Sequence, residues 1–269
     1  MTVVDAHHHL WDTSAREYSW MDGPWADPIR GRFDVARYAA AGPVDASVVV
    51  QAVMDEAETF ELLANRAAPV AGVVGWTDLT APDVADRLAA LRSAGPLVGI
   101  RHLVQDEPDP GWLTRPSVVR GIAAVGAAGL VYDLLVKPPQ ARAALDVVRR
   151  LPEVSFVLDH AGKPDIAGGM WEPWAGWITE LAALPNVTVK LSGLVTEAAT
   201  EWKPADILPY ARHVLSAFGA DRVMYGSDWP VCTLAAPPDQ VRALALEAVP
   251  PEDRTAVFGT TARRIYGLG

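Results

Sequence analysis

The chain has 269 residues, of which 50% are hydrophobic and 21% charged, and its formal net charge is -10. This composition is typical of a globular protein, and the length suits one large α/β domain or two smaller ones. The acidic balance excludes a general nucleic-acid binder, because such proteins carry clusters of basic residues.

No apolar run reaches the ~18 residues needed to cross a membrane, and no signal peptide is visible at the start. The single cysteine, Cys232, excludes an intrachain disulfide. We therefore expect a cytoplasmic protein without membrane contact, and a single domain over residues 1–269. The sequence is silent on oligomeric state.

The first predicted strand, residues 3–7, ends in a cluster of three histidines. Side chains alternate between the two faces of a strand, so we expect His7 and His9 to share one face with Asp5 and His8 to point away. Two imidazoles on one face can bind the same metal ion, with Zn–N distances near ~2.0–2.1 Å. This pattern is the strongest single indication of function in the first part of the chain.

Short runs rich in β-branched residues recur along the chain, and between them lie stretches with helix-start and helix-stop signals. Near-continuous apolar strands are typical of a parallel sheet that is buried on both faces. Eight alternations of strand and helix predict a closed (β/α)8 barrel, with an open doubly wound sheet as the alternative. The open sheet is less favoured because no Gly-x-Gly-x-x-Gly follows the first strand. The predicted strands cover residues 3–7, 47–53, 70–76, 98–103, 130–136, 155–160, 188–191 and 222–225, and residues 254–268 are predicted to form a closing helix.

Polar residues collect where these strands end, which is where barrel enzymes place their chemistry. The first and eighth strands are neighbours in a closed barrel, so we expect Asp228 to lie beside His7 and His9. An aspartate next to a metal ion or an imidazolium stays ionised, so Asp228 is available as a base toward water. The strand-end residues are His7, His9, Gln51, Arg101, His102, Asp133, Asp159, His160, Lys190, Ser192 and Asp228.

Together these stretches resemble the amidohydrolase superfamily, and more narrowly its amidohydrolase 2 branch of metal-dependent hydrolases, which includes lactonases. The first-strand motif Asp-x-His-x-His is by itself moderately specific for this family. Its combination with Asp-His-Ala-Gly-Lys-Pro and Gly-Ser-Asp-Trp-Pro is strongly specific. The matching segments follow the family's order at residues 4–12, 99–102, 132–135, 158–164, 189–193 and 225–230.

The resemblance implies a (β/α)8 barrel, hydrolase activity, and metal ligands at His7, His9, His160 and Asp228. The bridging lysine or glutamate usual on the fourth strand is missing, and so is the usual fifth-strand histidine. A two-metal centre is therefore disfavoured. We expect one divalent ion, zinc before others, or none.

As a hypothesis, the enzyme opens a lactone ring. Asp228 takes a proton from water and returns it to the leaving alkoxide, while the histidines, directly or through the ion, stabilise the oxyanion. His102 would act with them by binding the carbonyl or a ring hydroxyl. The expected catalytic residues are Asp228, His102 and His160, and the expected substrate-binding residues are Arg101, Lys163, Gln51, Trp11, Trp112 and Trp229.

The charged residues at the strand ends favour a sugar-acid lactone over a dicarboxylate. A dicarboxylate would require several arginines, since their planar fork binds carboxylates bidentately, and only Arg101 lies firmly at a strand end. Two other hypotheses stay open. The resemblance also allows a metal-dependent decarboxylase of aromatic acids, since related amidohydrolase barrels perform this reaction, and the other hypothesis is a non-catalytic sugar-binding barrel. Release of carbon dioxide would favour the first, and tight binding without turnover the second.

Overall fold

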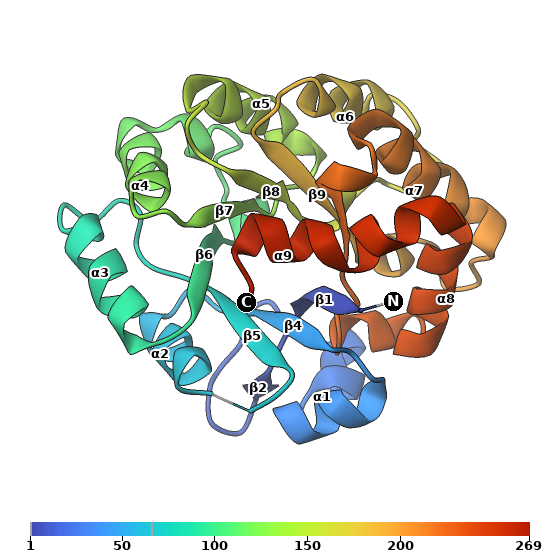
Figure 1. Cartoon of the computed structure of the whole chain (residues 1–269), viewed down its shortest axis with the longest axis horizontal. Helices are drawn as coiled ribbons and strands as arrows, with labels where there is room; N and C mark the ends of the chain where they lie inside the picture. Colours follow the sequence, from blue (N-terminus) through green and yellow to red (C-terminus); the bar gives the residue numbers. More distant parts are fainter. Residues whose placement is uncertain (1, 66) are drawn as a thin grey trace.

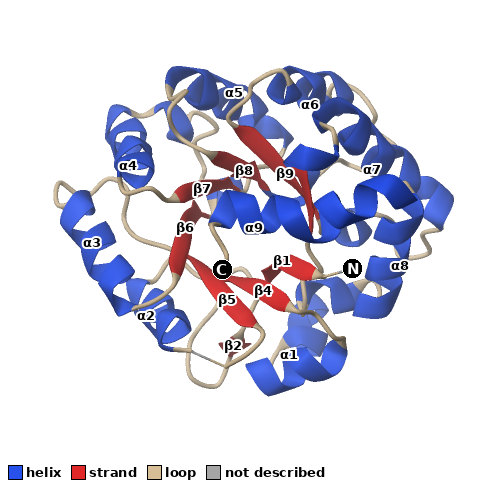
Figure 2. Cartoon of the chain, in the orientation of Figure 1, coloured by secondary structure: helices blue, strands red, loops and turns tan. Residues whose placement is uncertain are grey.

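The computed structural model describes residues 2–65 and 67–269 of the chain. Eight parallel strands form one sheet in which each strand pairs with the next along the chain. Helices lie outside this sheet and alternate with its strands (Figures 1 and 2). The strands are β1 (Val4–His8), β4 (Ala46–Val50), β5 (Val70–Gly75), β6 (Leu97–His102), β7 (Val131–Leu134), β8 (Phe156–Leu158), β9 (Val187–Leu191) and β10 (Val223–Tyr225).

Backbone hydrogen bonds between the first and last strands close the sheet. The amide of Asp228 donates to the carbonyl of His7 at 2.8 Å, and the amide of His9 donates to the carbonyl of Trp229 at 2.7 Å. These bonds flank a parallel bridge between His8 and Trp229. The predicted (β/α)8 barrel is confirmed, and the open-sheet alternative is wrong because an open sheet has no such contact.

The helices that follow the strands begin and end close to the predicted helix-start and helix-stop signals. Asp55 caps α2, which begins at Glu56, by accepting a hydrogen bond from the amide of Ala57. The predicted closing segment contains a short π-helical turn and α9. The helices are α1 (Val35–Ala41), α2 (Glu56–Ala64), α3 (Val84–Ala94), α4 (Pro116–Ala127), α5 (Ala141–Arg150), α6 (Trp174–Ala182), α7 (Pro204–Phe218), α8 (Pro238–Ala248) and α9 (Thr261–Tyr266).

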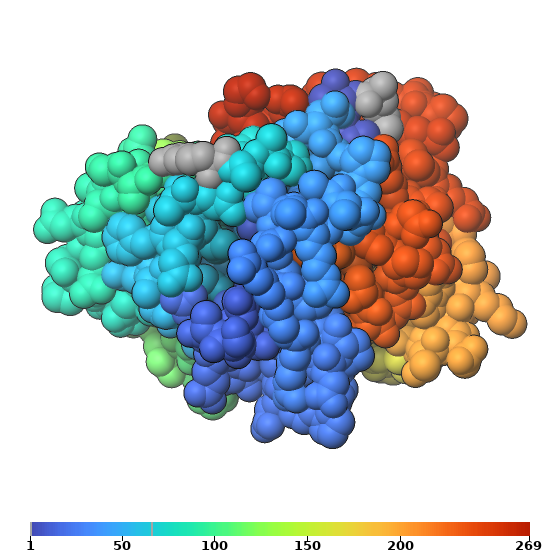
Figure 3. Space-filling view, turned by 90° about the horizontal axis from the view of Figure 1, so that it is seen from below, coloured from blue at the N-terminus to red at the C-terminus, as the bar shows by residue number. Residues whose placement is uncertain are grey.

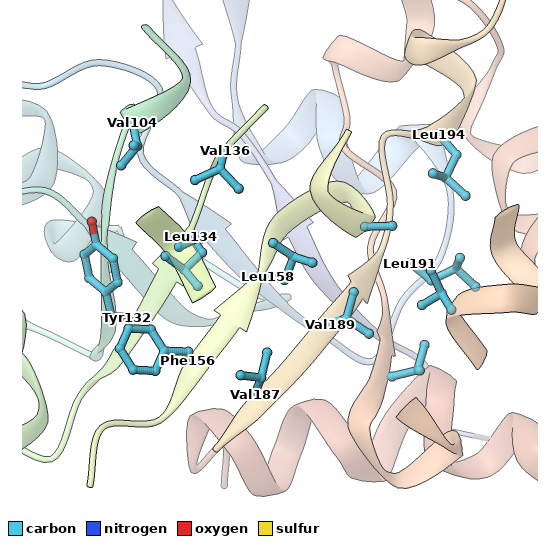
Figure 4. Packing of buried hydrophobic residues seen from close by; sticks show 14 of the residues in the cluster. Val104, Tyr132, Leu134, Val136, Phe156, Leu158, Val187, Val189, Leu191 and Leu194 are labelled. Atoms are coloured by element: carbon cyan, nitrogen blue, oxygen red, sulfur yellow. The ribbon is translucent and has the colours of Figure 1, made fainter. Parts of the chain in front are cut away.

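Two apolar layers hold the barrel together. The larger fills the space between strands and helices, and Figure 4 shows Val187, Val189 and Leu191 of β9 in it. Because side chains alternate along a strand, Lys190 of β9 then points into the barrel. A smaller interior cluster includes Tyr266, which α9 contributes. Figure 1 shows α9 lying across the barrel beside the chain's N-terminus.

Residues 11–33, called here the N-terminal excursion, cover one side of the barrel. The N-terminal excursion contains a two-stranded antiparallel ribbon, β2 (Trp11–Asp12) with β3 (Arg32–Phe33), and the 3-10 turn η1 (Pro24–Ile29) between them. Figure 3 shows the blue N-terminal part of the chain between the cyan and the orange-red segments. The turn η1 packs against η8 (Val231–Leu234), which follows the last strand. The described residues include no helix long and apolar enough to cross a membrane.

Candidate active site at the carboxyl ends of the strands

His7, His9 and Asp228 converge at the carboxyl end of the barrel. Oδ1 of Asp228 lies 3.7 Å from Nε2 of His7 and 3.4 Å from Nε2 of His9, and the two imidazole nitrogens are 3.3 Å apart. Nδ1 of His9 lies 2.8 Å from the carbonyl of Val50, which fixes the far side of that ring. The three side chains come from the two ends of the chain, and closure of the barrel brings them together.

An irregularity in β1 separates Asp5 from this group, so the prediction that Asp5 shares a face with His7 and His9 is wrong. Asp5 pairs with Ser47, but His8 pairs with Val49, so one extra residue lies in β1 between them. A bulge of this kind breaks the alternation of side chains. Asp5 instead accepts hydrogen bonds from Ser227, at its amide and its hydroxyl, and supports the loop that carries the site aspartate.

His8 points away from the site, as predicted. Its ring stacks on Tyr38 with centroids 3.8 Å apart, and its Nε2 lies 3.0 Å from the hydroxyl of Ser47. The first strand therefore delivers two of its three histidines to the barrel mouth.

His160 joins the group from the end of β8, in a left-handed backbone conformation with φ of 52°. Its Nε2 lies 4.0 Å from Oδ1 of Asp228, and its Nδ1 lies 2.9 Å from the hydroxyl of Ser192. A Cβ on Gly193 would lie 2.5 Å from Nδ1 of His160, so only glycine leaves room for this ring. Asp228 also has a positive φ of 58°. Such conformations cost about 1–3 kcal/mol each and cluster at functional sites.

A buried network of charged residues lies beneath the histidines. The ammonium of Lys190 is 2.6 Å from Oδ2 of Asp133 and 2.9 Å from Oδ1 of Asp159. Arg101 contacts Oδ2 of Asp159 at 3.0 Å. Tyr266 donates its hydroxyl hydrogen to Asp133, so the network reaches the last helix. Isolated charges are expensive to bury, and this network supplies each charge with an opposite partner.

These three residues, Asp133, Asp159 and Lys190, were expected at or near strand ends, but no role was predicted for them. The sequence carries a signal for these buried charges. Val131–Leu134 contains an aspartate and Val187–Leu191 contains a lysine, although both strands are otherwise apolar or neutral. Lys and Asp are almost never fully buried unless they are paired. Two such residues of opposite charge on strands of one barrel therefore indicate an internal ion pair.

Burial and neighbouring charges set the protonation of the site. Burial lowers the pKa of His160 to about 4, and burial followed by the charge of Lys190 lowers the pKa of His7 well below its ordinary value. Burial opposes ionisation of Asp228, but His160 and His9 hold its pKa below the usual value. At neutral pH His7 and His160 are therefore neutral imidazoles and Asp228 is a carboxylate, the forms that bind a metal ion.

The donor atoms fit one metal ion. A tetrahedral zinc with bonds of ~2.0–2.2 Å holds its ligand atoms about 3.3–3.6 Å apart. The three spacings among His7, His9 and Asp228 are 3.3, 3.4 and 3.7 Å. A second set of donors, His7, Asp159 and His160, also lies close together, but Lys190 and Arg101 already contact Asp159 there.

A cavity of about 700 Å³ opens above this group. Five of the residues expected to form the site line it: His9, Arg101, His160, Lys163 and Asp228. Lys163 forms an ion pair with Glu197 at 3.1 Å. Further lining residues that sequence reasoning did not assign include Trp20, Trp25, Gln105, Asp106, Lys137 and Glu197.

His102 and Trp112 lie outside the cavity wall, so the expectation that His102 contacts substrate finds no support in its position. Its Nδ1 accepts from the indole of Trp76 at 3.1 Å, and its Nε2 lies 2.7 Å from a carboxylate oxygen of Glu107. The ring stacks on Trp112 with centroids 4.0 Å apart. Arg101 precedes it in the same strand and points inward, as alternation requires.

Trp11 and Trp229 are also buried away from the cavity. The indole of Trp11 donates to the carbonyl of Ile29 at 2.9 Å, and Trp229 packs between Phe33 and Tyr38. Neither ring offers a free face to a substrate.

Gln51 is buried and joined to Arg101. Its amide nitrogen donates to the carbonyl of Arg101 at 3.2 Å, while the guanidinium of Arg101 donates to the carbonyl of Gln51. Gln51 therefore helps to hold Arg101, rather than lining the cavity.

Comparison with known proteins agrees with this architecture. The chain is 40% identical over 238 residues to an L-fucono-1,5-lactonase of Burkholderia ambifaria, covering 86% of this chain and 81% of that protein. It is 38% identical, over an alignment of 286 positions, to an L-fucono-1,5-lactonase of Burkholderia multivorans, and this alignment covers 98% of this chain and 96% of that protein. A crystal structure of an amidohydrolase from Burkholderia multivorans with bound zinc superposes with a TM-score of 0.93 at 38% identity, covering 100% of both chains. A model of the amidohydrolase family matches residues 4–268, and the chain belongs to this family of hydrolases.

Proposed function

We propose that this protein hydrolyses a sugar-acid lactone of the L-fuconolactone type. The observation that carries the proposal is the convergence of His7, His9 and Asp228, at spacings of 3.3–3.7 Å, at a cavity that His9, Asp228 and His160 line. The relatives named as L-fucono-1,5-lactonases support the substrate class. Decarboxylation of an aromatic acid is less supported, because these relatives are lactonases.

We propose that one zinc ion binds to His7, His9 and Asp228. The fit of the donor spacing to a single ion supports this assignment, as does the zinc in the related amidohydrolase. When bound, the ion would polarise the lactone carbonyl.

Asp228 accepts the proton of the attacking water in this proposal. All its contacts with imidazole nitrogens involve Oδ1, which leaves Oδ2 for the proton. The water oxygen bonds to the carbonyl carbon, and the bond from that carbon to the ring oxygen breaks. Asp228 then returns its proton to the ring oxygen, which leaves as a hydroxyl. His160 and Arg101 line the same cavity and are placed to bind the carbonyl oxygen, whose negative charge grows during attack.

A pH-indicator assay over a panel of sugar lactones, with and without added zinc, tests the proposal, because ring opening releases an acid. We expect the wild type to hydrolyse L-fucono-1,5-lactone and Asp228→Asn to lose about 10²–10⁴-fold in kcat, the usual contribution of a general base. Asp86→Asn, on the exposed face of α3, is the matched control. Near-wild-type turnover by Asp228→Asn, or carbon dioxide release from aromatic acids without lactone hydrolysis, would overturn the assignment.

A further inference from the structure

Two of the three lysine and arginine side chains that line the cavity are paired within the protein. Lys163 contacts Glu197 at 3.1 Å, and Arg101 contacts Asp159 at 3.0 Å. The third, Lys137, is exposed and forms no ion pair with another described residue. A dianionic substrate needs several unpaired cations, since recognition of carboxylates depends on charge-assisted hydrogen bonds, and the cavity offers one. Its paired donors and acceptors suit the hydroxyl groups of a neutral ring.

Two tryptophans of the N-terminal excursion line the same cavity. The rings of Trp20 and Trp25 have centroids 6.2 Å apart and planes inclined by 35°. Each indole N–H is already used: Trp20 donates to the carbonyl of Ala52 at 2.7 Å, and Trp25 donates to the carbonyl of Asp22 at 2.6 Å. What the two side chains can offer a ligand is therefore their ring surface.

Trp25 is 51% exposed, more than most large hydrophobic side chains of the protein. It lies in η1, the turn that packs against η8 immediately after the strand-end aspartate. The packing of η1 positions Trp25, and an indole hydrogen bond holds each of the two rings. A fixed aromatic surface in a cavity with a few polar groups is the usual composition of a small-molecule site.

We propose that Trp20 and Trp25 form an aromatic platform on which the ring of a neutral polyhydroxy lactone stacks. The proposal rests on the lactonase function and adds the residues that select its substrate. The aliphatic C–H face of a sugar ring packs on the indoles, and the ring hydroxyls meet polar groups such as the Lys163–Glu197 pair. The hydroxyl contacts hold a sugar ring against the indoles, so the platform and these polar groups together favour sugar lactones over small unsubstituted ones.

Steady-state kinetics of Trp25→Ala test the platform, with L-fucono-1,5-lactone compared with δ-valerolactone, a six-membered lactone without hydroxyls. We expect KM for the sugar lactone to rise about tenfold, the scale of lost apolar contact in a pocket, while kcat stays within about twofold. Kinetics with δ-valerolactone should not change, and Trp25→Phe should restore most of the loss. Trp171→Ala, a 37% exposed tryptophan outside the cavity, is the matched control.

Binding is measured separately by quenching of tryptophan fluorescence with L-fucose, a neutral sugar ring without a lactone bond to hydrolyse. We expect weaker binding to Trp25→Ala than to wild type or Trp171→Ala. An unchanged KM and an unchanged affinity for the sugar in Trp25→Ala would overturn the platform while leaving lactone hydrolysis intact. A wild type that hydrolyses no lactone would instead overturn the proposed function, and the fluorescence titration would still decide whether the platform binds a sugar ring.

Discussion

The ammonium of Lys190 lies 3.0 Å from Nδ1 of His7, and Oδ1 of Asp159 lies 3.3 Å from the same nitrogen. These two contacts require opposite tautomers of the imidazole. An ammonium only donates, so its contact places the ring hydrogen on Nε2, whereas the carboxylate accepts and places it on Nδ1. Nε2 faces Asp228, and it can bind a metal ion only in the second tautomer. Asp159 thus favours metal binding by His7, and Lys190 opposes it.

Asp159→Asn should lower zinc affinity by about 10–100-fold, the usual effect of changing a residue that orients a metal-binding histidine. Titration against a chromogenic chelator measures the affinity without reference to activity. Asp86→Asn, which removes an exposed carboxylate on α3, is the control. Unchanged zinc affinity in a folded Asp159→Asn protein would show that the carboxylate does not set the tautomer.

Lys190→Met should lower the free energy of unfolding by about 3–5 kcal/mol, because it leaves two buried carboxylates without their ammonium partner. The side chains of Lys190 and Asp133 are both 0% exposed. The double variant Lys190→Met/Asp133→Asn should recover part of this loss, since one unpaired charge is removed. Urea unfolding of the three proteins gives the comparison, and Lys203→Met, at an exposed lysine, controls for loss of a surface charge. A loss of less than 1 kcal/mol in Lys190→Met would contradict a paired buried network.

The fold followed from the sequence because each strand carries its own local signal. Runs of β-branched residues set the strands, and Asp55 and the prolines mark helix starts. Closure then placed Asp228 beside His7 and His9, since neighbouring strands bring their carboxyl ends together.

The bulge in β1 could not be predicted, because an extra residue in one strand depends on its register with the partner strand. Which tryptophans line the cavity could not be predicted either. Trp20 and Trp25 line the cavity because of the path of the N-terminal excursion. Trp11 and Trp229 are buried away from the cavity. No periodic pattern distinguishes these two groups along the chain.

His102→Phe should leave kcat/KM for lactone hydrolysis within about threefold of wild type and lower the free energy of unfolding by about 1–3 kcal/mol. The substitution keeps the stack on Trp112 but leaves Trp76 and Glu107 without their hydrogen-bond partner. His160→Gln, at the cavity wall, should in contrast lose at least about a hundredfold in kcat/KM. A loss for His102→Phe as large as that of Asp228→Asn would return His102 to the catalytic group.

Glu58 supports the loop that follows β4. Its Oε2 accepts from the amides of Ala52 at 2.9 Å and Val53 at 3.1 Å, and Ala52 lines the cavity. The side chain is buried, and its Oε1 has no hydrogen-bond partner among the described residues. Burial raises the pKa of Glu58 to about 7, above the ordinary 4.5.

A raised carboxyl pKa means that the folded protein binds the proton more tightly than the unfolded chain. The contribution of Glu58 to stability is therefore fully present below pH 4.5 and is lost as the pH rises through about 7. Glu58→Gln keeps a carbonyl oxygen for the two amides but cannot ionise. Relative to wild type, its free energy of unfolding should improve by about 2–3 kcal/mol between pH 5 and pH 8. Urea unfolding at both pH values measures this difference, and Glu61→Gln, on the exposed side of α2, controls for loss of a glutamate. A Glu58→Gln variant whose stability relative to wild type is the same at both pH values would mean that this carboxyl ionises in the fold as readily as in the unfolded chain.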